Sequence, residues 1–142
     1  MKIFFDTNVY VAEALLGETA GQLLSATEKA GWRIYASTYL LDELVRVMTE
    51  QLQFSRRLAA LSRTRIIRRA ALVEPGESRH QVPEDVKDSP ILKSALEAAV
   101  DYLITNDRHL LDLNPYEGLR IISMAAYHQL LVNEGFIPTE NA

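Results

Sequence analysis

The sequence has 142 residues, of which 48% are hydrophobic and 24% are charged. This length and balance predict one globular domain with a buried core and exclude an intrinsically disordered chain. The absence of cysteine excludes disulfides and thiolate metal sites, and it fits a reducing compartment such as the cytoplasm. No apolar run approaches the roughly 20 residues that span a bilayer, and the apolar start ends at Asp6, so we expect neither a membrane segment nor a signal peptide.

The formal net charge is −4, but the charges are unevenly distributed along the chain. One segment without any acid contains Arg56, Arg57, Arg63, Arg65, Arg68 and Arg69. An arginine-dense segment in an acidic protein offers a phosphate-binding face, or it is simply a solvated helix surface. Both interpretations stay open on the sequence alone.

The first half of the chain alternates short apolar runs with helical patterns. Taken in chain order, the expected elements are a strand over 2–5, helices over 9–16 and 19–30, a strand over 33–36, and helices over about 38–52 and 54–69. Gly17 separates the first two helices, and Ser37 or Thr38 suits the cap of the third.

The second half continues this alternation. We expect a strand over 71–73, a long loop over 74–87, a helix from Asp88-Ser89-Pro90 to about 99, strands over 102–105 and 119–122, and a last helix over 124–132. Short apolar strands that alternate with helices indicate an α/β fold with a mostly parallel central sheet flanked by helices. No repeat or linker divides the chain, so we expect one domain over residues 1–142.

Two aspartates follow apolar runs at the places where strands are expected to end. Asp6 follows the first run directly, and Asp107 comes shortly after Leu103-Ile104. Ligands of α/β folds bind at the carboxyl ends of strands, and a carboxylate beside buried apolar residues is costly unless it is paired or binds a metal. Each aspartate equally suits a turn residue that accepts hydrogen bonds from its own backbone.

Two further acids fall on predicted helices. Glu43 lies three residues after Leu40 and four before Val47, at the edge of a predicted buried stripe, where an acid is often only a rim residue. Asp88 extends the apolar side of the next helix at its N-terminal end, where Asp88 or Ser89 also suits a helix cap. A cap on the buried edge also points into a cleft, so the two roles of Asp88 are compatible.

The segments that contain these four acids resemble the four motifs of PIN domains. They read FFDTNVYV (4–11), STYLLDEL (37–44), DVKDSPILKSA (85–95) and DYLITND (101–107). Each motif alone is weak, but all four occur in the family's order and together they span nearly the whole chain. The strongest likeness is to the bacterial and archaeal branch that supplies the toxins of toxin–antitoxin pairs (VapC-like).

The resemblance implies that Asp6, Glu43, Asp88 and Asp107 are catalytic acids that hold a metal ion. Carboxylate ligands without cysteine or a histidine cluster favour Mg²⁺ or Mn²⁺ over zinc. Clustered carboxylates repel one another unless a cation lies between them, and such a cation activates water and stabilises charge on a phosphate. The sequence leaves open whether the site takes one ion or two.

Other polar residues of the motifs are candidates for supporting roles. We expect Asn8 to orient Asp6, and Thr105 and Asn106 to orient Asp107 or contact the scissile phosphate, although all three also suit ordinary turn chemistry. His109 is the only histidine near a proposed ligand, and we expect it to have a surface or capping role.

The resemblance also implies an activity and partners. It predicts an endoribonuclease that hydrolyses RNA phosphodiester bonds with Mg²⁺ or Mn²⁺ and acts in the cytoplasm as a toxin, with an antitoxin partner and as a homodimer. The sequence itself holds no aromatic RNA-binding motif. Contact with the RNA backbone is therefore assigned to the arginine segment, with Arg65 and Arg68 as candidates.

Two other enzyme classes place an aspartate after the first strand. Haloacid-dehalogenase-type phosphatases require a second aspartate two residues later, where this sequence has Asn8, and response-regulator receivers require paired early acids and a late lysine that we do not find. The remaining alternative is a non-catalytic PIN-like module that binds protein or RNA.

Overall fold

The computed structural model of the chain describes residues 1–74 and 89–139. Within these residues, five short strands form one parallel sheet in the order β3-β2-β1-β4-β5. The strands are β1 (Lys2–Phe5), β2 (Arg33–Ser37), β3 (Ala71–Val73), β4 (Tyr102–Ile104) and β5 (Arg120–Ile122). The α/β fold expected from the sequence is therefore confirmed, and all of the paired strands in these ranges are parallel.

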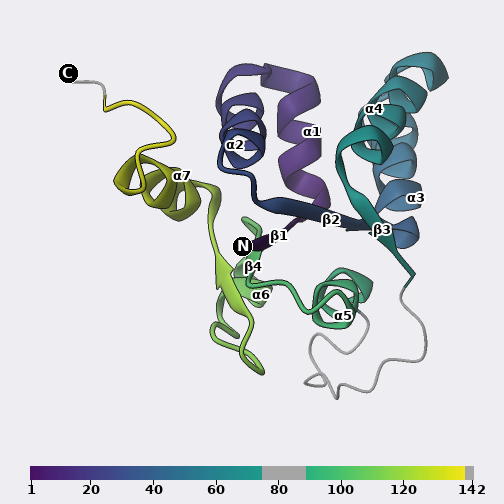
Figure 1. The fold of residues 1–142 in the computed structure, drawn as a ribbon. Coiled ribbons are helices and arrows are strands. Elements are labelled where there is room, and N and C mark those ends of the chain that lie inside the picture. Colours follow the sequence, from purple (N-terminus) through teal and green to yellow (C-terminus); the bar gives the residue numbers. More distant parts are fainter. Residues whose placement is uncertain (75–88, 140–142) are drawn as a thin grey trace.

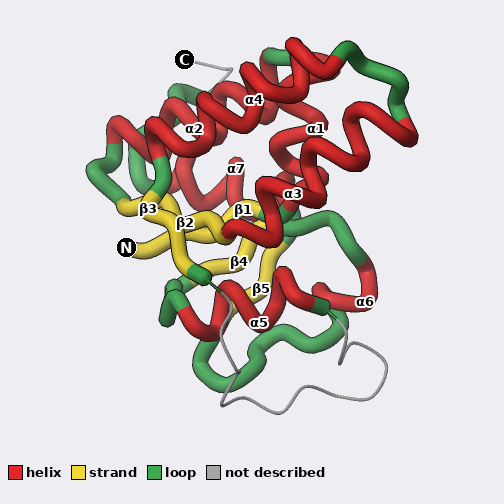
Figure 2. Tube along the Cα trace, turned by 90° about the vertical axis from the view of Figure 1, so that its right-hand side faces the viewer, coloured by secondary structure: helices red, strands yellow, loops and turns green. Residues whose placement is uncertain are grey.

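Helices cover both faces of this sheet. They are α1 (Thr7–Leu16), α2 (Glu18–Lys29), α3 (Thr38–Arg46), the π-helix η1 (Val47–Gln51), α4 (Arg56–Arg69), α5 (Pro90–Glu97), α6 (Arg108–Leu111) and α7 (Met124–Asn133). Figure 1 shows α1, α2, α3 and α4 on one side of the sheet and α5 on the other. In the side view of Figure 2, α6 lies with α5 below the strands.

The two central strands form the core of the molecule. Ile3, Phe4 and Phe5 of β1 and Leu103 and Ile104 of β4 are completely buried, as expected for parallel strands that are covered on both faces. This burial explains why these strands read as uninterrupted apolar runs in the sequence. Asp6, which directly follows β1, is consequently buried as well, whereas Asp107, three residues after β4, is exposed.

The last helix packs on the same side of the sheet as α2. The hydroxyl groups of Thr27 on α2 and Tyr127 on α7 form a buried hydrogen bond. The Tyr127 ring also meets Phe5 of β1 edge to face, with 5.7 Å between the ring centroids. These contacts anchor α7 to the core rather than leaving it as a loose terminal helix.

Polar caps start the helices directly after the strands. The side chains of Asp6, Ser37, Ser89, Asp107 and Ser123 each accept a hydrogen bond from a backbone N–H in the first turn of the helix that follows. Such caps satisfy N–H groups that have no partner within the helix. Ser37 is the last residue of β2, and Asp6, Asp107 and Ser123 follow a strand by no more than three residues, so these helix N-termini gather at the carboxyl edge of the sheet.

The strand order reverses between β1 and β4. From β1 the chain passes through α1 and α2 to β2 on one side, whereas β4 lies on the other side of β1 and leads outward to β5. Ligands of open parallel sheets bind in the crevice at such a switch point. Asp6 and Asp107 follow the two strands that border it.

The structure differs from the expected elements in two places. The helix expected over about 38–52 is α-helical only to Arg46 and continues as the π-helix η1, in which Leu52 N donates to Val47 O over 3.0 Å. A hydrogen bond from the Thr49 hydroxyl to Val45 O, 2.8 Å long, competes with the regular backbone pattern at this point. The four-residue helix α6 was not predicted, because it is too short to show a helical period.

Two further expectations meet the limits of the described ranges. Asp88, and the expected loop over 74–87 apart from Glu74, lie outside the described residues. Among the residues that are described, no helix combines the length and the apolar content that crossing a membrane requires.

Candidate active site

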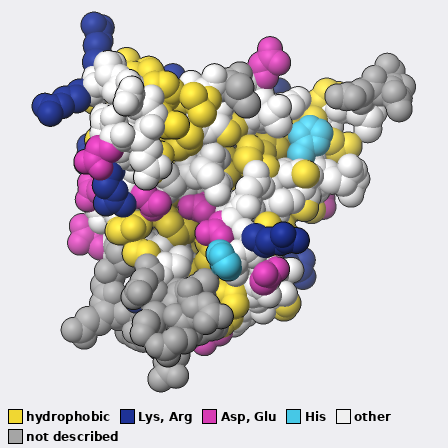
Figure 3. Space-filling view, turned by 180° about the vertical axis from the view of Figure 1, so that it is seen from behind, with side chains coloured by type: hydrophobic (Ala, Val, Ile, Leu, Met, Phe, Trp, Pro, Cys, Tyr) yellow, Lys and Arg dark blue, Asp and Glu magenta, His cyan; other side chains and the backbone are white. Residues whose placement is uncertain are grey.

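A cleft of about 520 Å³ lies at the carboxyl edge of the sheet. Its polar lining consists of Asp6, Thr7, Asn8, Glu43, Ser89, Asp107 and His109. Its apolar lining consists of Val11, Tyr39, Val47, Pro90, Ile91 and Leu110. Figure 3 shows acidic side chains grouped across the middle of one face, beside a histidine. Three of the four acids predicted from the sequence therefore share one cleft.

Asp6 is held in place by the start of α1 and by the neighbouring strand. Its side chain is 7% exposed, and its Oδ1 accepts a hydrogen bond of 2.6 Å from the backbone N–H of Thr7. Its own backbone N–H donates to Ile104 O over 2.9 Å, which continues the pairing of β1 with β4 by one residue. The Thr7 amide thus holds the carboxylate, and the bond to Ile104 fixes the backbone that carries it.

Burial raises the pKa of Asp6 from 3.8 to about 6. Loss of water around the carboxylate is the largest cause, and the charges of Glu43 and Asp107 raise the pKa further. Hydrogen bonds from the Thr105 hydroxyl and the Thr7 amide oppose this effect by stabilising the charged form. A nearby cation would lower the pKa, because it would offset both the lost hydration and the repulsion.

Thr105 links the two strand-end aspartates. Its buried hydroxyl donates to Asp6 Oδ2 over 2.6 Å and accepts from the backbone N–H of Asp107 over 2.9 Å. A weaker contact of 3.5 Å comes from Asn8 Nδ2. One donor and two acceptor positions are all that a hydroxyl offers, so the Thr105 hydroxyl is fully used in aligning this edge of the site.

Glu43 enters the cleft from α3. Its side chain is half-buried, and within the described residues Glu43 Oε2 is buried without a hydrogen-bond partner. A buried carboxylate oxygen without a partner is costly in a folded protein, and a ligand that supplies positive charge removes this cost. Tyr39 and Val47, one turn to either side of Glu43 on the same face of the helix, line the same cleft.

Asp107 is the most accessible of the three acids. It is exposed, and its Oδ1 accepts a hydrogen bond of 2.9 Å from the backbone N–H of His109, which makes it the cap of α6. Within the described residues, its Oδ2 forms no hydrogen bond or ion pair. The His109 side chain, for which a surface or capping role was expected, is exposed and lines the cleft.

The remaining polar residues of the motifs occupy different positions. Asn8 Nδ2 donates to Asp6 Oδ2 over 3.4 Å, and Asn8 Oδ1 has no partner within the described residues. Asn106 is exposed, and its Oδ1 accepts a hydrogen bond of 3.1 Å from Met124 N at the start of α7. Asn8 therefore lies beside the acid it was expected to orient, whereas the Asn106 oxygen ties β4 to the α7 junction.

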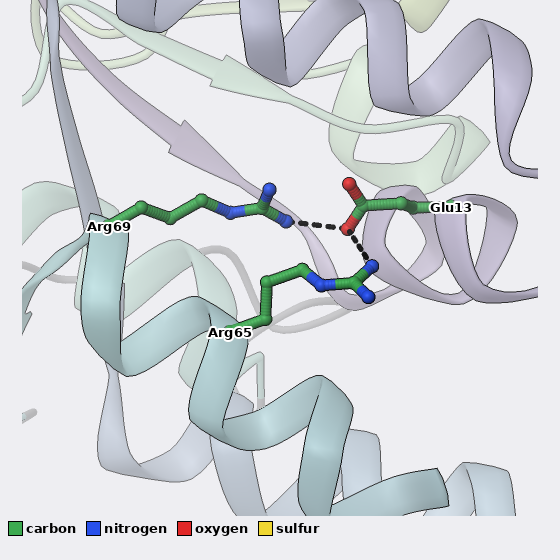
Figure 4. A network of polar contacts seen from close by, with 3 residues as sticks. All are labelled: Glu13, Arg65 and Arg69. Atoms are coloured by element: carbon green, nitrogen blue, oxygen red, sulfur yellow. Dashed lines mark hydrogen bonds and ion pairs between the residues drawn. The ribbon is translucent and has the colours of Figure 1, made fainter.

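The two arginines predicted to contact RNA lie on α4, away from the acids. Arg65 Nη1 is 4.0 Å from Glu13 Oε1 on α1, and the Arg65 side chain is 59% exposed. Arg69 binds the same oxygen at 2.5 Å, as Figure 4 shows. Arg68 is exposed and forms no ion pair with any described residue.

Sequence reasoning missed several residues of the cleft. Thr7 is 5% exposed and lines the cleft, and within the described ranges its hydroxyl has no hydrogen-bond partner. The apolar wall formed by Val11, Tyr39 and Val47 was also missed. Its signal was present, because Tyr39, Glu43 and Val47 recur every four residues, but that spacing equally describes a stripe that packs in the core.

The residues present fit a hard divalent cation. No three His, Asp or Glu side chains among the described residues lie close enough together to bind an ion as they stand. The cleft nevertheless offers only oxygen and one imidazole as donors, it holds the unpartnered oxygen of Glu43, and it raises the pKa of Asp6. Mg²⁺ and Mn²⁺ suit such a set, since water completes their coordination where the protein supplies few ligands.

Comparisons with known proteins bear on this fold and cleft. A family model described as "PIN domain" matches residues 2–109. No curated protein matches the sequence. A chain from the crystal structure of VapBC2 from Rickettsia felis bound to a DNA fragment from their promoter is similar in structure, with a TM-score of 0.63 and 15% sequence identity over 87% of this chain and 98% of that chain. At this identity the likeness concerns the fold.

Proposed function

The chain belongs to the PIN-domain family, and on that premise we propose that it is an endoribonuclease that hydrolyses RNA phosphodiester bonds with Mg²⁺ or Mn²⁺. The observation that carries the proposal is the position of Asp6, Glu43 and Asp107 in one cleft at the switch point of the sheet. Asp88 is the fourth acid of the motif set and lies outside the described residues.

The acids are the proposed metal ligands. Asp6 and Asp107 are assigned as central ligands, with Glu43 and Asp88 binding the ion directly or through water. When bound, the ion lowers the pKa of a water molecule and stabilises negative charge on the phosphate. We assign Asn8, Thr105 and Asn106 to orienting the ligands or contacting the phosphate. Among these three residues, the assignment of Thr105 is supported by the largest number of hydrogen bonds.

The chain's own groups prepare this site before any substrate arrives. The Thr105 hydroxyl and the Thr7 amide hold both oxygens of Asp6, and His109 N fixes one oxygen of Asp107. Such hydrogen bonds keep ligand carboxylates in place during the reaction and spare the cost of ordering them. The sequence offers Arg65 and Arg68 as candidates for contact with the RNA backbone, a role that their substitution by glutamine tests.

We also propose that the protein is a toxin with an antitoxin partner and that it forms a homodimer in the cytoplasm. The support is the resemblance of its motifs to the toxin branch, together with a fold similar to that of a chain from the VapBC2 complex. A short neighbouring reading frame for a small protein with a basic or DNA-binding segment would support the pairing.

The function is tested by cleavage of a panel of structured RNAs with Mg²⁺ or Mn²⁺. Wild-type protein is compared with Asp6→Asn and Asp107→Asn, and with the control Asp112→Asn, which makes the same change at an exposed aspartate outside the cleft. We expect both site variants to lose activity by at least about 100-fold, the scale on which metal ligands and their partners act, and the control to retain it. Activity that survives in Asp6→Asn would point to a contaminating nuclease.

The alternative function is a non-catalytic module that binds protein or RNA. One observation favours this alternative. Among the described residues, no three acidic or histidine side chains lie close enough together to bind a metal ion. Wild-type protein that cleaves no RNA with either ion, but still binds RNA or a protein partner, would favour the module over the enzyme.

A further inference from the structure

Four of the six arginines of α4 lie in two groups, one beside α1 and one beside a groove. Arg69 is 15% exposed and binds Glu13, a side chain that is itself 12% exposed, and Arg65 approaches the same oxygen from the solvent side (Figure 4). Arg69 also lies over the ring of Tyr10, 5.8 Å from its centre. These two arginines therefore connect α4 to α1.

A second group faces a groove on the other side of α4. The groove has a volume of about 520 Å³ and lies between α4 and the continuous helix formed by α3 and η1. Arg56 and Arg63 line it from α4, and Arg46 lines it from α3. Within the described ranges none of these three arginines forms an ion pair, although Asp42 and Glu50 line the same groove.

The lining of the groove carries three arginines and two acids, so its formal charge is +1. Three guanidinium groups face one groove, and Arg56 stands at the first position of α4, where the helix dipole repels a cation. Asp42 and Glu50 lie four residues before and after Arg46 and offset part of its charge, whereas no acid of α4 lies beside Arg56 and Arg63. An anionic ligand would complement the remaining positive charge, and the guanidinium group matches the geometry of a phosphate.

The groove and the acidic cleft are on adjacent sides of α3. Glu43 lines the cleft and Asp42 lines the groove, and these neighbours point about 100° apart on an α-helix. Arg46 follows Glu43 by three residues and so lies between the two openings. A helix is roughly 10–12 Å wide, so a flexible strand that reaches the cleft passes into the groove after a few nucleotides.

We propose that this arginine groove binds backbone phosphates of the RNA strand that is cleaved. These phosphates lie a few nucleotides away from the cleavage position. Arg46, Arg56 and Arg63 are its phosphate ligands, and their contacts are to the backbone, so they add affinity with little sequence preference. The inference rests on the proposed function for the nature of the ligand. It assigns the backbone contacts to residues other than Arg65 and Arg68, and the experiment separates the two sets.

The test compares two variants that each remove two charges from α4. Arg56→Gln/Arg63→Gln removes the groove arginines, and Arg65→Gln/Arg68→Gln removes arginines on another side of the same helix. Glutamine has nearly the helix propensity of arginine, so both variants are expected to fold. Affinity for a fluorescein-labelled single-stranded 2′-O-methyl oligoribonucleotide is measured in EDTA at several salt concentrations, and circular dichroism checks the folds.

We expect the groove variant to bind more weakly and to show a slope of log affinity against log salt that is shallower by about 1.4, which corresponds to about 0.7 for each lost phosphate contact. The slope for Arg65→Gln/Arg68→Gln should differ from that of wild type by less than about 0.35, which is half the change expected for one lost phosphate contact. Arg46→Gln alone should change the slope by about 0.7.

The inference is overturned if the groove variant keeps the wild-type slope, or if both variants lose it equally. In the first case the groove would belong to a protein partner rather than to RNA. Because the assay contains no divalent ion and the oligonucleotide cannot be cleaved, its result is independent of catalysis. Loss of cleavage in Asp6→Asn would leave the proposed function standing even if the groove fails.

Discussion

Asp6 combines two roles that place opposite demands on one side chain. As the cap of α1 it must stay fixed against backbone N–H groups, and as a proposed ligand it must stay ionised. Burial works against ionisation, so the pKa of Asp6 rises to about 6. The hydrogen bonds from Thr105 and Thr7 recover part of this cost, which is why the residue can be both buried and acidic.

We predict that Asp6→Asn stabilises the metal-free protein at neutral pH. The pKa of Asp6 is higher in the folded chain, at about 6, than its ordinary value of 3.8. The folded state therefore binds the proton more tightly, and the wild-type protein loses stability as pH rises between these two values. At about 1.4 kcal/mol per pH unit, the loss reaches up to about 3 kcal/mol above pH 6. Asparagine caps a helix as well as aspartate and carries no charge, so the loss of the hydrogen bond from Thr105, about 1 kcal/mol, offsets only part of this gain.

The measurement is urea unfolding in EDTA at several pH values. The free energy of unfolding of Asp6→Asn minus that of wild type should be constant below pH 3.8 and should rise in favour of the variant as pH approaches about 6. Parallel pH dependences of the two proteins would contradict the assigned pKa.

Thr105→Val tests the hydroxyl that joins the two aspartates. The variant keeps the shape of the side chain but leaves Asp6 Oδ2 and Asp107 N without their strong partner, which should cost about 1–3 kcal/mol of stability. It should also weaken metal binding and lower kcat, because Asp6 loses a bond that favours its charged form. Thr105→Ser retains the hydroxyl, and its recovery of metal affinity and kcat would separate the bond from a simple packing effect.

At the scale of elements, α1 organises both the cleft and the arginine helix. Asp6 caps its N-terminus, and Glu13 two turns later binds Arg69 of α4. The helix α4 is short of apolar contacts, since only Ala59 and Ile66 of its side chains are buried. The ion pair is therefore a main link between these two helices, and its removal should act on α4 in particular.

We predict that Glu13→Gln destabilises the protein by about 3 kcal/mol, because it leaves the guanidinium of Arg69 buried without a counter-charge. Arg65→Gln should cost less than about 1 kcal/mol, because that side chain is 59% exposed and 4.0 Å from its partner. Urea unfolding measures both. The double variant Glu13→Leu/Arg69→Met should recover much of the loss, and if it does not, packing rather than the charge pair is responsible.

At the scale of the whole molecule, an acidic protein is proposed to act on a polyanion. The net charge of −4 repels RNA at long range, so affinity must come from local cations and from the metal. The topology makes this feasible, since the acids gather at one edge of the sheet and the groove arginines lie across α3 from them. Because α3 separates the groove arginines from the acids of the cleft, the arginines do not pair with the proposed metal ligands that the structure describes.

We predict that Mg²⁺ or Mn²⁺ stabilises the wild-type protein against unfolding. At a concentration about 100 times its Kd, an ion that binds only the folded state adds about 2.7 kcal/mol. Thermal unfolding near pH 7 should show this gain for wild type and little of it for Asp6→Asn or Asp107→Asn. Choline chloride at matched ionic strength is the control, and equal stabilisation of all variants would indicate general screening in place of a site.

The sequence by itself determined the elements and much of the family. Local periodicity predicted most of the strands and helices, because the spacing of apolar residues along a short segment reflects which of its side chains are buried. The apolar run from Ile3 to Phe5 is an example. For two helices the sequence left a pair of candidate caps, Ser37 or Thr38 and Asp88 or Ser89, and the structure places the caps at Ser37 and Ser89. Four acids were singled out through motif order. For Asp6, Glu43 and Asp107 the structure shows a shared cleft, while their role as ligands stays a prediction.

Only the tertiary structure decided which side chains meet. Thr105 and Asp6 are 99 residues apart in the sequence, and their hydrogen bond depends on β1 pairing with β4 in one register. The division of the arginines between Glu13 and the groove likewise depends on how α4 lies between its neighbours. No local pattern encodes such contacts, because they are set by how the helices and strands pack together, and packing is a property of the whole chain.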